Sequence, residues 1–397
     1  MGVPKLRFKA DDGSDFPDWE GMTLGDVGSV AMCKRVFKEQ TREVGDVPFF
    51  KIGTFGGVPD AYISKSLFDE LKSKYAYPEV GTILLSASGT IGRQVEYQGE
   101  DAYYQDSNIV WLEHDDTVLD SYLKQFYSVV KWQGLEGSTI KRLYNKTILD
   151  TPFYRPSLPE QRKIADLLSA VDDVISAQEA EVAAWEKRKK GVMQKLFSQE
   201  VRFKADDGSN FPDWEEKTLG EICEQLKASI DPRNNPTKQF IEYSMPAYDN
   251  HMAAQAVLGQ SMNSARKILS APCVLINKLN VRKRRIWVVE HPEDNAVCSS
   301  EFVPLTSAEF DLRFLGYLAM TDSFTGYLLD CSSGSSNSQK RVTPDTILQY
   351  LVSLPSLPEQ RKIADCLTSL GDVIAKAKDE LDAWRELKKG LLQQMFV

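Results

Sequence analysis

The sequence is poor in the residues that catalytic and metal sites require. Its six cysteines are scattered without C-x-x-C or other metal-type spacing, which argues against a zinc site or a disulfide framework and favours a reducing compartment. Only three histidines occur, His114, His251 and His291, and none has a spaced partner typical of a catalytic triad or a metal site. No G-x-x-x-x-G-K-[ST] phosphate loop is present. We therefore expect no metal, no cofactor and no active site in this chain.

Long apolar runs and an excess of positive charge are also missing. No 18-residue apolar run could span a bilayer, and the first residues turn polar too early for a signal peptide, so we expect a cytoplasmic protein without membrane contact. The formal net charge of −9 at pH 7 argues against a generally basic coat for nucleic acid, although it leaves room for a local basic face. With 42% hydrophobic and 26% charged residues, the 397-residue chain is typical of a globular protein.

What the sequence does contain is a duplication. Residues 6–27, LRFKADDGSDFPDWEGMTLGDV, return at 201–222 with 16 of 22 positions identical. Residues 156–175, PSLPEQRKIADLLSAVDDVI, return at 355–374 with 15 of 20 identical. The first pair is offset by 195 residues and the second by 199, while the segments between them have diverged. One constant frame therefore holds two unlike inserts, each of about 130 residues and long enough to bury its own core.

The repeats divide the chain into four expected segments. They are a first variable domain over residues 1–155 with its lead-in at 6–27, a helix over 156–198, a second variable domain over 199–354 with its lead-in at 201–222, and a second helix over 355–397. We expect Phe16 to Trp19 and its copy to pin each connector against the helix ends.

Each PSLPEQ motif predicts the start of a long helix, because Pro159 or Pro358 suits a first turn and Glu160 or Glu359 complements the helix dipole. Apolar residues then recur every 3.5 residues over roughly five heptads, the pattern of a coiled-coil seam. The seam residues expected to face the other helix are Ile164, Leu168, Val171, Ile175, Val182, Trp185, Ile363, Leu367, Leu370, Ile374, Leu381 and Trp384. Lys189 and Lys388 also fall on seam positions, where lysine can specify register or extend its charge to water.

The apolar stripe alone does not decide between parallel and antiparallel pairing. Antiparallel pairing, which we adopt, would place the two variable domains at opposite ends of a rod of about 57 Å, at about 1.5 Å per residue. VRFKADDGS follows the first helix directly, whereas LRFKADDGS stands near the start of the chain. The end of the second helix near residue 5 would therefore close a pseudo-twofold circular arrangement.

The variable parts have a mixed α/β pattern. Residues 81–98 and 271–291 each predict a strand, a turn and a second strand, and residues 101–112 and 295–305 each predict a further strand. Short amphipathic helices are expected within 118–130 and 311–322, before a small-residue loop that ends in a basic pair. The expected fold is α/β (mixed α+β), with two such domains separated by a long antiparallel two-helix coiled coil.

Two variable domains that alternate with two repeated helices, each introduced by P-x-L-P-E-Q-R-K-I-A, closely resemble the specificity subunit of type I restriction-modification systems. The W-x-x-x-x-L-G-[DE] lead-ins, Trp19 to Asp26 and Trp214 to Glu221, are similar to that family's entry to a target-recognition domain. The resemblance covers practically the whole chain. It implies a non-catalytic subunit in which each recognition domain binds one half of a bipartite, asymmetric double-stranded DNA target, and the helices set the gap between the halves.

The resemblance also implies partner subunits. Two methyltransferase (modification) subunits would bring S-adenosylmethionine and methylate adenine N6, and motor-nuclease (restriction) subunits would translocate DNA with ATP and Mg²⁺. This chain shows only poor approaches to an adenine methyltransferase motif, starting at Asp150 and Asn235. Methyl transfer is therefore not predicted here.

The most basic cluster predicts DNA contact in the second variable domain. It consists of Arg282, Lys283, Arg284 and Arg285, framed by Asn277, Lys278 and Asn280. Arginine can bond guanine, asparagine can bond adenine, and any of the cations can bind phosphate. The alternative is a solvated hairpin tip. Because strand residues alternate in direction, about half of the four would reach DNA.

The other candidate contacts lie in three loops. In the first variable domain, the matching hairpin offers Ser86, Ser88, Thr90 and Arg93, whose small neighbours allow close backbone approach, although a plain turn is the alternative. The basic-pair loops supply Ser138, Thr139, Lys141, Arg142, Ser338, Gln339, Lys340 and Arg341. The alternative interpretation of these residues is that they are solvated at the entry to a helix.

Two other functional hypotheses compete with DNA recognition. A coiled-coil scaffold that joins two protein-binding domains would have no DNA role, and the basic tetrad with the duplicated Lys-Arg loops argues against it. A self-contained modifying enzyme is disfavoured by the missing catalytic motifs.

Overall fold

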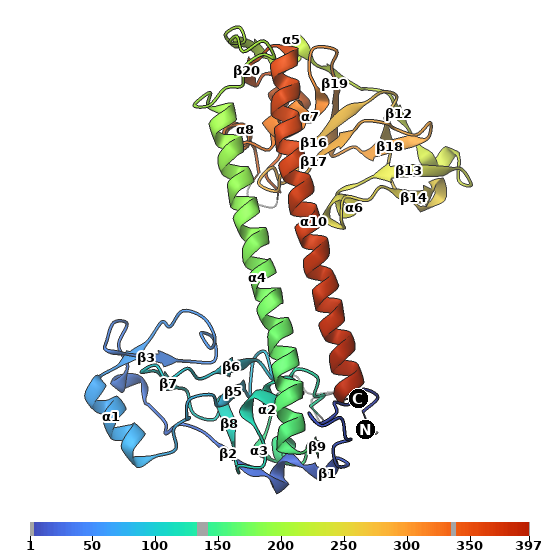
Figure 1. The fold of residues 1–397 in the computed structure, drawn as a ribbon. Helices are drawn as coiled ribbons and strands as arrows, with labels where there is room; N and C mark the ends of the chain where they lie inside the picture. The colour runs from blue at the N-terminus through green and yellow to red at the C-terminus, as the bar shows by residue number, and fades with distance from the viewer. Residues whose placement is uncertain (1–3, 133–141, 335–338, 397) are drawn as a thin grey trace. The chain divides into compact units, whose positions relative to one another are not determined.

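Two compact units make up the fold of the chain. The computed structural model describes residues 4–132, 142–334 and 339–396. Unit 1 comprises Met1–Glu179 and Asp379–Val397, and unit 2 comprises Ala180–Lys378 (Figure 1). Each unit therefore contains one variable domain, the first part of one long helix and the last part of the other.

Unit 1 is built on two small sheets. Its inner antiparallel sheet has the order β2-β8-β5-β6, with bounds Gly28–Ala31, Ile109–His114, Ile83–Ser86 and Gln94–Glu96. Its outer sheet has the order β4-β3-β7, with bounds Tyr62–Ile63, Val47–Phe50 and Tyr103–Tyr104. β1 (Glu20–Thr23) pairs with β9 (Pro152–Arg155). The shorter helices are α1 (Lys65–Lys74), α2 (Asp120–Tyr127) and α3 (Asn145–Leu149).

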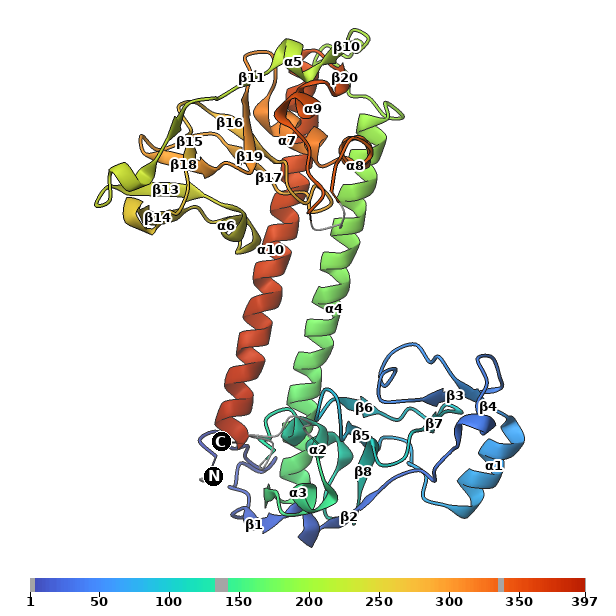
Figure 2. The same cartoon turned by 180° about the vertical axis from the view of Figure 1, so that it is seen from behind.

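Unit 2 repeats this plan with a larger outer sheet (Figure 2). Its inner sheet has the order β11-β19-β16-β17, with bounds Glu224–Gln225, Phe302–Thr306, Cys273–Asn277 and Ile286–Val289. The outer sheet has the order β12-β15-β18-β13-β14, with bounds Ser229–Ile230, Arg266–Ile268, Ala296–Ser299, Gln239–Tyr243 and Gln255–Leu258. β10 (Glu215–Thr218) pairs with β20 (Leu351–Leu354). The shorter helices are α5 (Leu219–Ile222), α6 (Met245–Asp249), α7 (Leu312–Ala319), α8 (Asp322–Asp330) and α9 (Pro344–Leu348).

The mixed α/β prediction is confirmed, but one detail of the strands is wrong. Residues 101–112 and 295–305 were each expected to hold one strand, and each holds two that belong to different sheets. In unit 1 the two strands are separated by a turn in which Ser107 adopts a left-handed φ of 57°. At this turn the chain leaves the outer sheet and enters the inner one. The break between the strands falls on polar residues in both units, Gln105 to Asn108 in unit 1 and Ser300 to Glu301 in unit 2.

Both repeated helices form, with 40 residues each: α4 spans Leu158–Phe197 and α10 spans Leu357–Phe396. Within unit 1 they run antiparallel, because Lys388 and Arg385 of α10 bond Asp172 and Glu179 of α4 at 2.5 and 2.7 Å. Unit 2 has the same direction, since Lys378 lies 2.6 Å from Glu186 and Gly371 faces Lys189 further along α4. No helix within the described residues is long and apolar enough to cross a membrane.

The seam residues fall into two groups by what they contact. Ile164 and Leu168 belong to the core of unit 1, and Ile363 and Leu367 to the core of unit 2, where they pack beneath the inner sheet. Further along the helices, a second group is buried or half-buried, namely Val171, Ile175, Val182, Trp185, Leu370, Ile374, Leu381 and Trp384. The first turns of each helix therefore complete a domain core.

A buried carboxylate ties the first lead-in to α4. Glu160 is fully buried, and its oxygens accept hydrogen bonds from Arg7 Nε at 3.1 Å, Arg7 Nη2 at 2.9 Å and Trp19 Nε1 at 3.0 Å. The same lead-in reaches the last turns of α10, since the Leu6 N–H donates to the Gln394 carbonyl at 3.0 Å. It thus connects the start of one long helix with the end of the other.

Unit 2 repeats this arrangement. Fully buried Glu359 accepts from Arg202 Nε at 3.1 Å, Arg202 Nη2 at 2.9 Å and Trp214 Nε1 at 3.0 Å. The Val201 N–H donates to the Lys195 carbonyl at 3.2 Å. We call these two groups the lead-in locks. The residues that form the side-chain contacts are the same in the two repeats, and they keep the lead-in and the long helices together in both units.

Candidate nucleic-acid interface

Each inner sheet presents a hairpin whose base is held by a buried polar side chain. In unit 1, Ser86 Oγ donates to the Thr90 carbonyl and accepts from the Arg93 N–H at 2.8 Å. In unit 2, the side-chain amide of Asn277 bridges the hairpin in the same way. Its Nδ2 donates to the Leu279 carbonyl at 2.9 Å and its Oδ1 accepts from the Arg285 N–H at 3.0 Å. Ser86 and Asn277 are 1% and 2% exposed, so both serve to shape the hairpin.

The hairpins and the basic-pair loops, which are far apart in sequence, meet in the structure. The Leu143 N–H donates to the Ala87 carbonyl at 2.8 Å in unit 1, and the Val342 N–H donates to the Lys278 carbonyl at 3.0 Å in unit 2. In unit 2 the Asn280 N–H also donates to the Lys340 carbonyl at 2.7 Å. The candidate residues thus form one surface in each unit, which we call the loop surface. Ser138, Thr139, Lys141 and Ser338 lie outside the described residues.

The loop surface of unit 1 carries two arginines on a framework of small polar residues. Arg93 is exposed and donates to the Phe55 carbonyl at 2.8 Å. Arg142 is half-buried and donates to the Ser107 carbonyl at 2.7 Å, while Ser88 bonds Asn108 at 2.9 Å. Within the described residues each guanidinium uses only part of its donor fork, since Arg93 also donates to Thr90 Oγ1 at 3.3 Å and Arg142 makes the one side-chain bond given above.

The loop surface of unit 2 divides the basic tetrad into two halves. Arg285 is 7% exposed and bonds Asp249 through two parallel contacts of 2.8 and 2.6 Å, which lower the pKa of the Asp249 carboxyl. Arg284 donates to the Met320 carbonyl at 2.7 Å and to Asp322. Arg282 and Lys283 are exposed, and their side chains have no hydrogen bond or ion pair within the described residues. The inner pair braces the hairpin and the outer pair faces solvent.

The remaining candidates of unit 2 frame this exposed pair. Lys278, Asn280 and Lys340 are half-buried, Gln339 is exposed, and Arg341 lies 3.1 Å from Glu301. The sequence did not point to Ser107 and Asn108, which join the loop surface of unit 1, or to Tyr144, which is 64% exposed two residues after Arg142. The sequence signal for the first two is the polar run Gln105 to Asn108 between apolar stretches, and for Tyr144 it is adjacency to the basic pair.

Metal-ligating side chains do not cluster in the part of the chain that the structure describes. Among them, no group of three or more histidine, cysteine or acidic side chains could hold a metal ion. Burial raises the pKa of the Cys33, Cys223 and Cys273 thiols to about 12, which keeps them protonated and unreactive at neutral pH.

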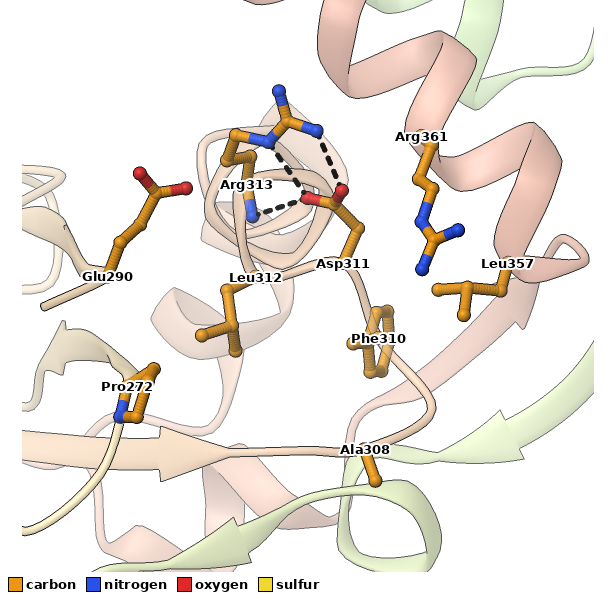
Figure 3. Close-up of a pocket in the computed structure, with 9 residues that line it drawn as sticks. All are labelled: Pro272, Glu290, Ala308, Phe310, Asp311, Leu312, Arg313, Leu357 and Arg361. Carbon is orange, nitrogen blue, oxygen red and sulfur yellow. Dashed lines mark hydrogen bonds and ion pairs between the residues drawn. The ribbon is translucent and has the colours of Figure 1, made fainter.

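A hollow of about 370 Å³ in unit 2 lies between α7 and the start of α10 (Figure 3). Its Asp311 carboxylate is already bonded by the Arg313 N–H and guanidinium at 2.8 to 3.2 Å, and Arg361 enters from α10. No histidine, cysteine or hydroxyl side chain is among its described lining residues. The hollow therefore combines two carboxylates, Glu290 and the braced Asp311, with the guanidiniums of Arg313 and Arg361.

Comparisons with known proteins agree with this geometry. Residues 17–184 and 212–383 match the family described as Type I restriction modification DNA specificity domain. A Haemophilus influenzae protein named as a type I restriction enzyme specificity subunit is 54% identical over 155 residues, which are 39% of this chain and 40% of that protein. The Type I restriction enzyme MjaVIII specificity subunit of Methanocaldococcus jannaschii is 23% identical over 98% of this chain and 95% of its own length.

Two solved structures have the same fold. The S subunit of a type I restriction-modification system from M. genitalium is similar with a TM-score of 0.59 at 17% identity, over 100% of this chain and 99% of that one. A chain from a study of complex assembly and conformational transition of the type I R-M system gives a TM-score of 0.55 at 14% identity, over 96% and 98% of the two chains.

Proposed function

The chain belongs to the type I restriction modification DNA specificity family and carries that domain twice, and we propose that each of its two units reads one half of a bipartite, asymmetric DNA target. It is a specificity subunit with two DNA specificity domains.

The observation that carries the proposal is the pair of loop surfaces on a common frame. The lead-in locks and the first turns of α4 and α10 are alike in the two units, down to the hydrogen-bond lengths. The loop surfaces differ, with hydroxyls and two partly anchored arginines in unit 1 and an exposed Arg-Lys pair in unit 2. Equal frames with unlike surfaces suit two different base sequences.

In this proposal the paired long helices set the number of base pairs between the half-sites. They also dock two methyltransferase subunits, and motor-nuclease subunits complete the complex. S-adenosylmethionine, ATP and Mg²⁺ bind to those partners. The chain itself positions the complex on DNA.

Base-resolution sequencing of methylated adenines tests the proposal directly. Cells that express this chain with its methyltransferase should acquire methylation at one split motif with a fixed gap, and cells that express the methyltransferase alone should not. Absence of any motif that depends on this chain would reject DNA recognition.

The scaffold hypothesis makes a different prediction for the isolated chain. Contacts between lysine or arginine and phosphates release counterions, so duplex binding must weaken steeply as salt is added. A scaffold for two proteins would show no such binding. The exposed Arg282 and Lys283 favour the DNA-reading function.

A further inference from the structure

Unit 1 has a cationic hollow beside its loop surface. It has a volume of about 630 Å³ and lies between the loop that follows α2 and the last turns of α10. Its described lining contains no acid and includes five cations, namely Lys5, Lys131, Arg385, Lys388 and Lys389. The floor is apolar, with Val129, Ile175 and Leu392, and Gln393 adds an amide.

The cations of this hollow differ in how they are paired. Arg385 and Lys388 bond acids of α4, Glu179 and Asp172, and are held in place by them. Lys389 contacts only Glu386, one turn away on the exposed face of α10, in a type of surface pair that contributes little. Lys5 and Lys131 have no side-chain hydrogen bond or ion pair within the described residues. Lys131 and Lys389 are thus available to an anion.

In unit 2 the corresponding place contains an anion that belongs to the protein. Asp322, the first residue of α8, accepts hydrogen bonds from Arg284 Nη2 of the hairpin and from Gln194 Nε2 of α4 at 3.4 Å, and it lies 4.0 Å from Lys190 Nζ. The bond from Arg284 lowers the pKa of the Asp322 carboxyl, which is therefore ionised at neutral pH. A cation and an amide from a long helix here surround a carboxylate.

The two places correspond residue by residue. The N–H groups of Leu119 and Asp311, which precede α2 and α7, both donate at 2.9 Å to a buried glutamine of a long helix, Gln161 or Gln360. If Leu119 is aligned with Asp311 on the basis of this shared contact, Val130 of unit 1 aligns with Asp322 of unit 2. Lys131 then aligns with Ser323.

The long helices continue the correspondence. Lys190 and Gln194 of α4 match Lys389 and Gln393 of α10 at the repeat offset of 199. Unit 1 therefore keeps the cation and the amide, lacks the carboxylate and gains a lysine.

The hollow is continuous with the loop surface of unit 1. Trp132, next to Lys131, lies so close to the hairpin that its Nε1 would be 2.8 Å from a Cβ added at Gly92. The loop wall of the hollow thus touches the hairpin that carries Ser88, Thr90 and Arg93. A strand that contacts this hairpin would have its neighbouring phosphates within reach of the hollow.

We infer that Lys131, Lys389 and Gln393 hold a phosphate of the DNA backbone next to the half-site of unit 1, in the place that Asp322 takes in unit 2. Lysine binds phosphate as a point charge, and an amide N–H donates to a phosphate oxygen. This inference rests on the proposed function. The two units would then differ in how they bind DNA. Unit 1 contacts a backbone phosphate through Lys389, whereas in unit 2 the equivalent Lys190 already lies near Asp322 of the protein.

Inorganic phosphate has the same chemistry as the backbone, and the two sources differ in how they reach the site. Lys131 and Lys389 are exposed, so a free phosphate must meet the full cost of ordering two long side chains. A backbone phosphate arrives tethered to bases that the loop surface already holds, at a high effective concentration. We therefore assign the site to the backbone.

The test uses the full chain, a duplex that contains its methylation motif, and a Lys131→Gln/Lys389→Gln double variant. Each neutralised phosphate contributes about 0.9 to the slope of log affinity against log salt, so the double variant, which loses one phosphate, should lower the steepness by about 0.9. The advantage of the wild type should then shrink roughly 3.5-fold between about 50 mM and about 200 mM salt. Lys190→Gln, whose lysine faces Asp322, is the matched control and should leave the slope unchanged.

A second pair of variants tests, without removing a lysine, whether a carboxylate at position 130 can take the place of the phosphate. Val130→Asp places a carboxylate where unit 2 has Asp322 and should reduce the slope as the double variant does. Val130→Asn has the same size without the charge and should retain the wild-type slope. Thermal melting of both variants separates a loss of binding from a loss of folding.

The outcomes separate this inference from the function on which it rests. If the wild type binds the duplex with a steep salt dependence and the double variant keeps that slope, the backbone site is refuted and DNA recognition stands. If calorimetry shows inorganic phosphate binding that the double variant loses while the duplex slope stays constant, the hollow is a small-anion site and the inference is again wrong. If the wild type shows no salt-dependent duplex binding, the proposed function fails first.

Discussion

Replacing Arg7 with methionine should destabilise unit 1 by about 3 kcal/mol. The substitution keeps the apolar stem of the side chain and removes both guanidinium bonds to Glu160, which is fully buried and keeps the hydrogen bond from the Trp19 N–H. Breaking a buried ion pair from one side typically costs about 3 to 5 kcal/mol. The lower end applies because Arg7 is itself 21% exposed, so water can partly replace it.

Calorimetric melting of the full chain is a suitable assay for this prediction. For a unit of this size, a loss of about 3 kcal/mol corresponds to a fall in Tm of roughly 6 to 12 °C. Arg202→Met should produce the matched loss in unit 2, since Arg202 bonds Glu359 with the same geometry. Asp18→Asn is the charge control, because Asp18 is fully exposed and only 3.6 Å from Arg7, and its melting should match the wild type.

A double variant tests the physical cause. Arg7→Met/Glu160→Gln removes the buried charge and leaves an amide oxygen for the Trp19 N–H, so it should recover more than half of the lost stability. A loss below about 1 kcal/mol for Arg7→Met, or no recovery in the double variant, would refute the claim that an unpaired buried carboxylate is responsible.

Three further predictions address other parts of the molecule. Gly371→Asp should stabilise unit 2 by about 1 kcal/mol in urea unfolding at pH 7, because it replaces a helical glycine and supplies an acid for Lys189, as Asp172 does for Lys388 in unit 1. Burial lowers the pKa of Lys189 in the folded state. In the wild type, the buried charge therefore destabilises the fold at pH values below this folded-state pKa, and the destabilisation fades as pH rises toward the pKa of lysine in the unfolded chain. Because the new aspartate pairs only with charged Lys189, Gly371→Asp should stabilise unit 2 less at pH 10 than at pH 7. Arg285→Met should unfold more easily because it leaves Asp249 unpaired, whereas Arg282→Met should melt like the wild type and bind the cognate duplex about tenfold more weakly, measured by fluorescence anisotropy. Removal of one heptad from both long helices should change the gap of the methylated motif, whereas removal from one helix should disrupt the pairing; an unchanged gap after the matched removal would show that the helices are not the ruler.

Much of the fold could be predicted because the chain repeats itself. The 3.5-residue period gave α4 and α10 to within a few residues, and alternating apolar residues gave the hairpin strands β5, β6, β16 and β17. The lead-in locks were foreseen only in part. The sequence pointed to the connector around Trp19, but the partner of Arg7 stands 153 residues away, and no local pattern reports such a distance.

The candidate site was less predictable for the same reason. The sequence offered a hairpin and a basic pair as separate candidates, and only long-range backbone bonds, such as that from Leu143 to Ala87, join them into one surface. Arg284 and Arg285 look like Arg282 in the sequence. Their acids, Asp322 and Asp249, lie 38 and 36 residues away along the chain, so their bracing role becomes visible only in the fold.

The division of labour between the two units is tested most directly by exchanging one variable part. Residues 223–350 are replaced with the equivalent segment of a relative that has a different target, both lead-in locks are retained, and methylated adenines are sequenced in cells with the methyltransferase. If each unit reads one half-site, one half of the split motif changes while the other half and the gap stay the same. A change in both halves, or in neither, would contradict this division of labour.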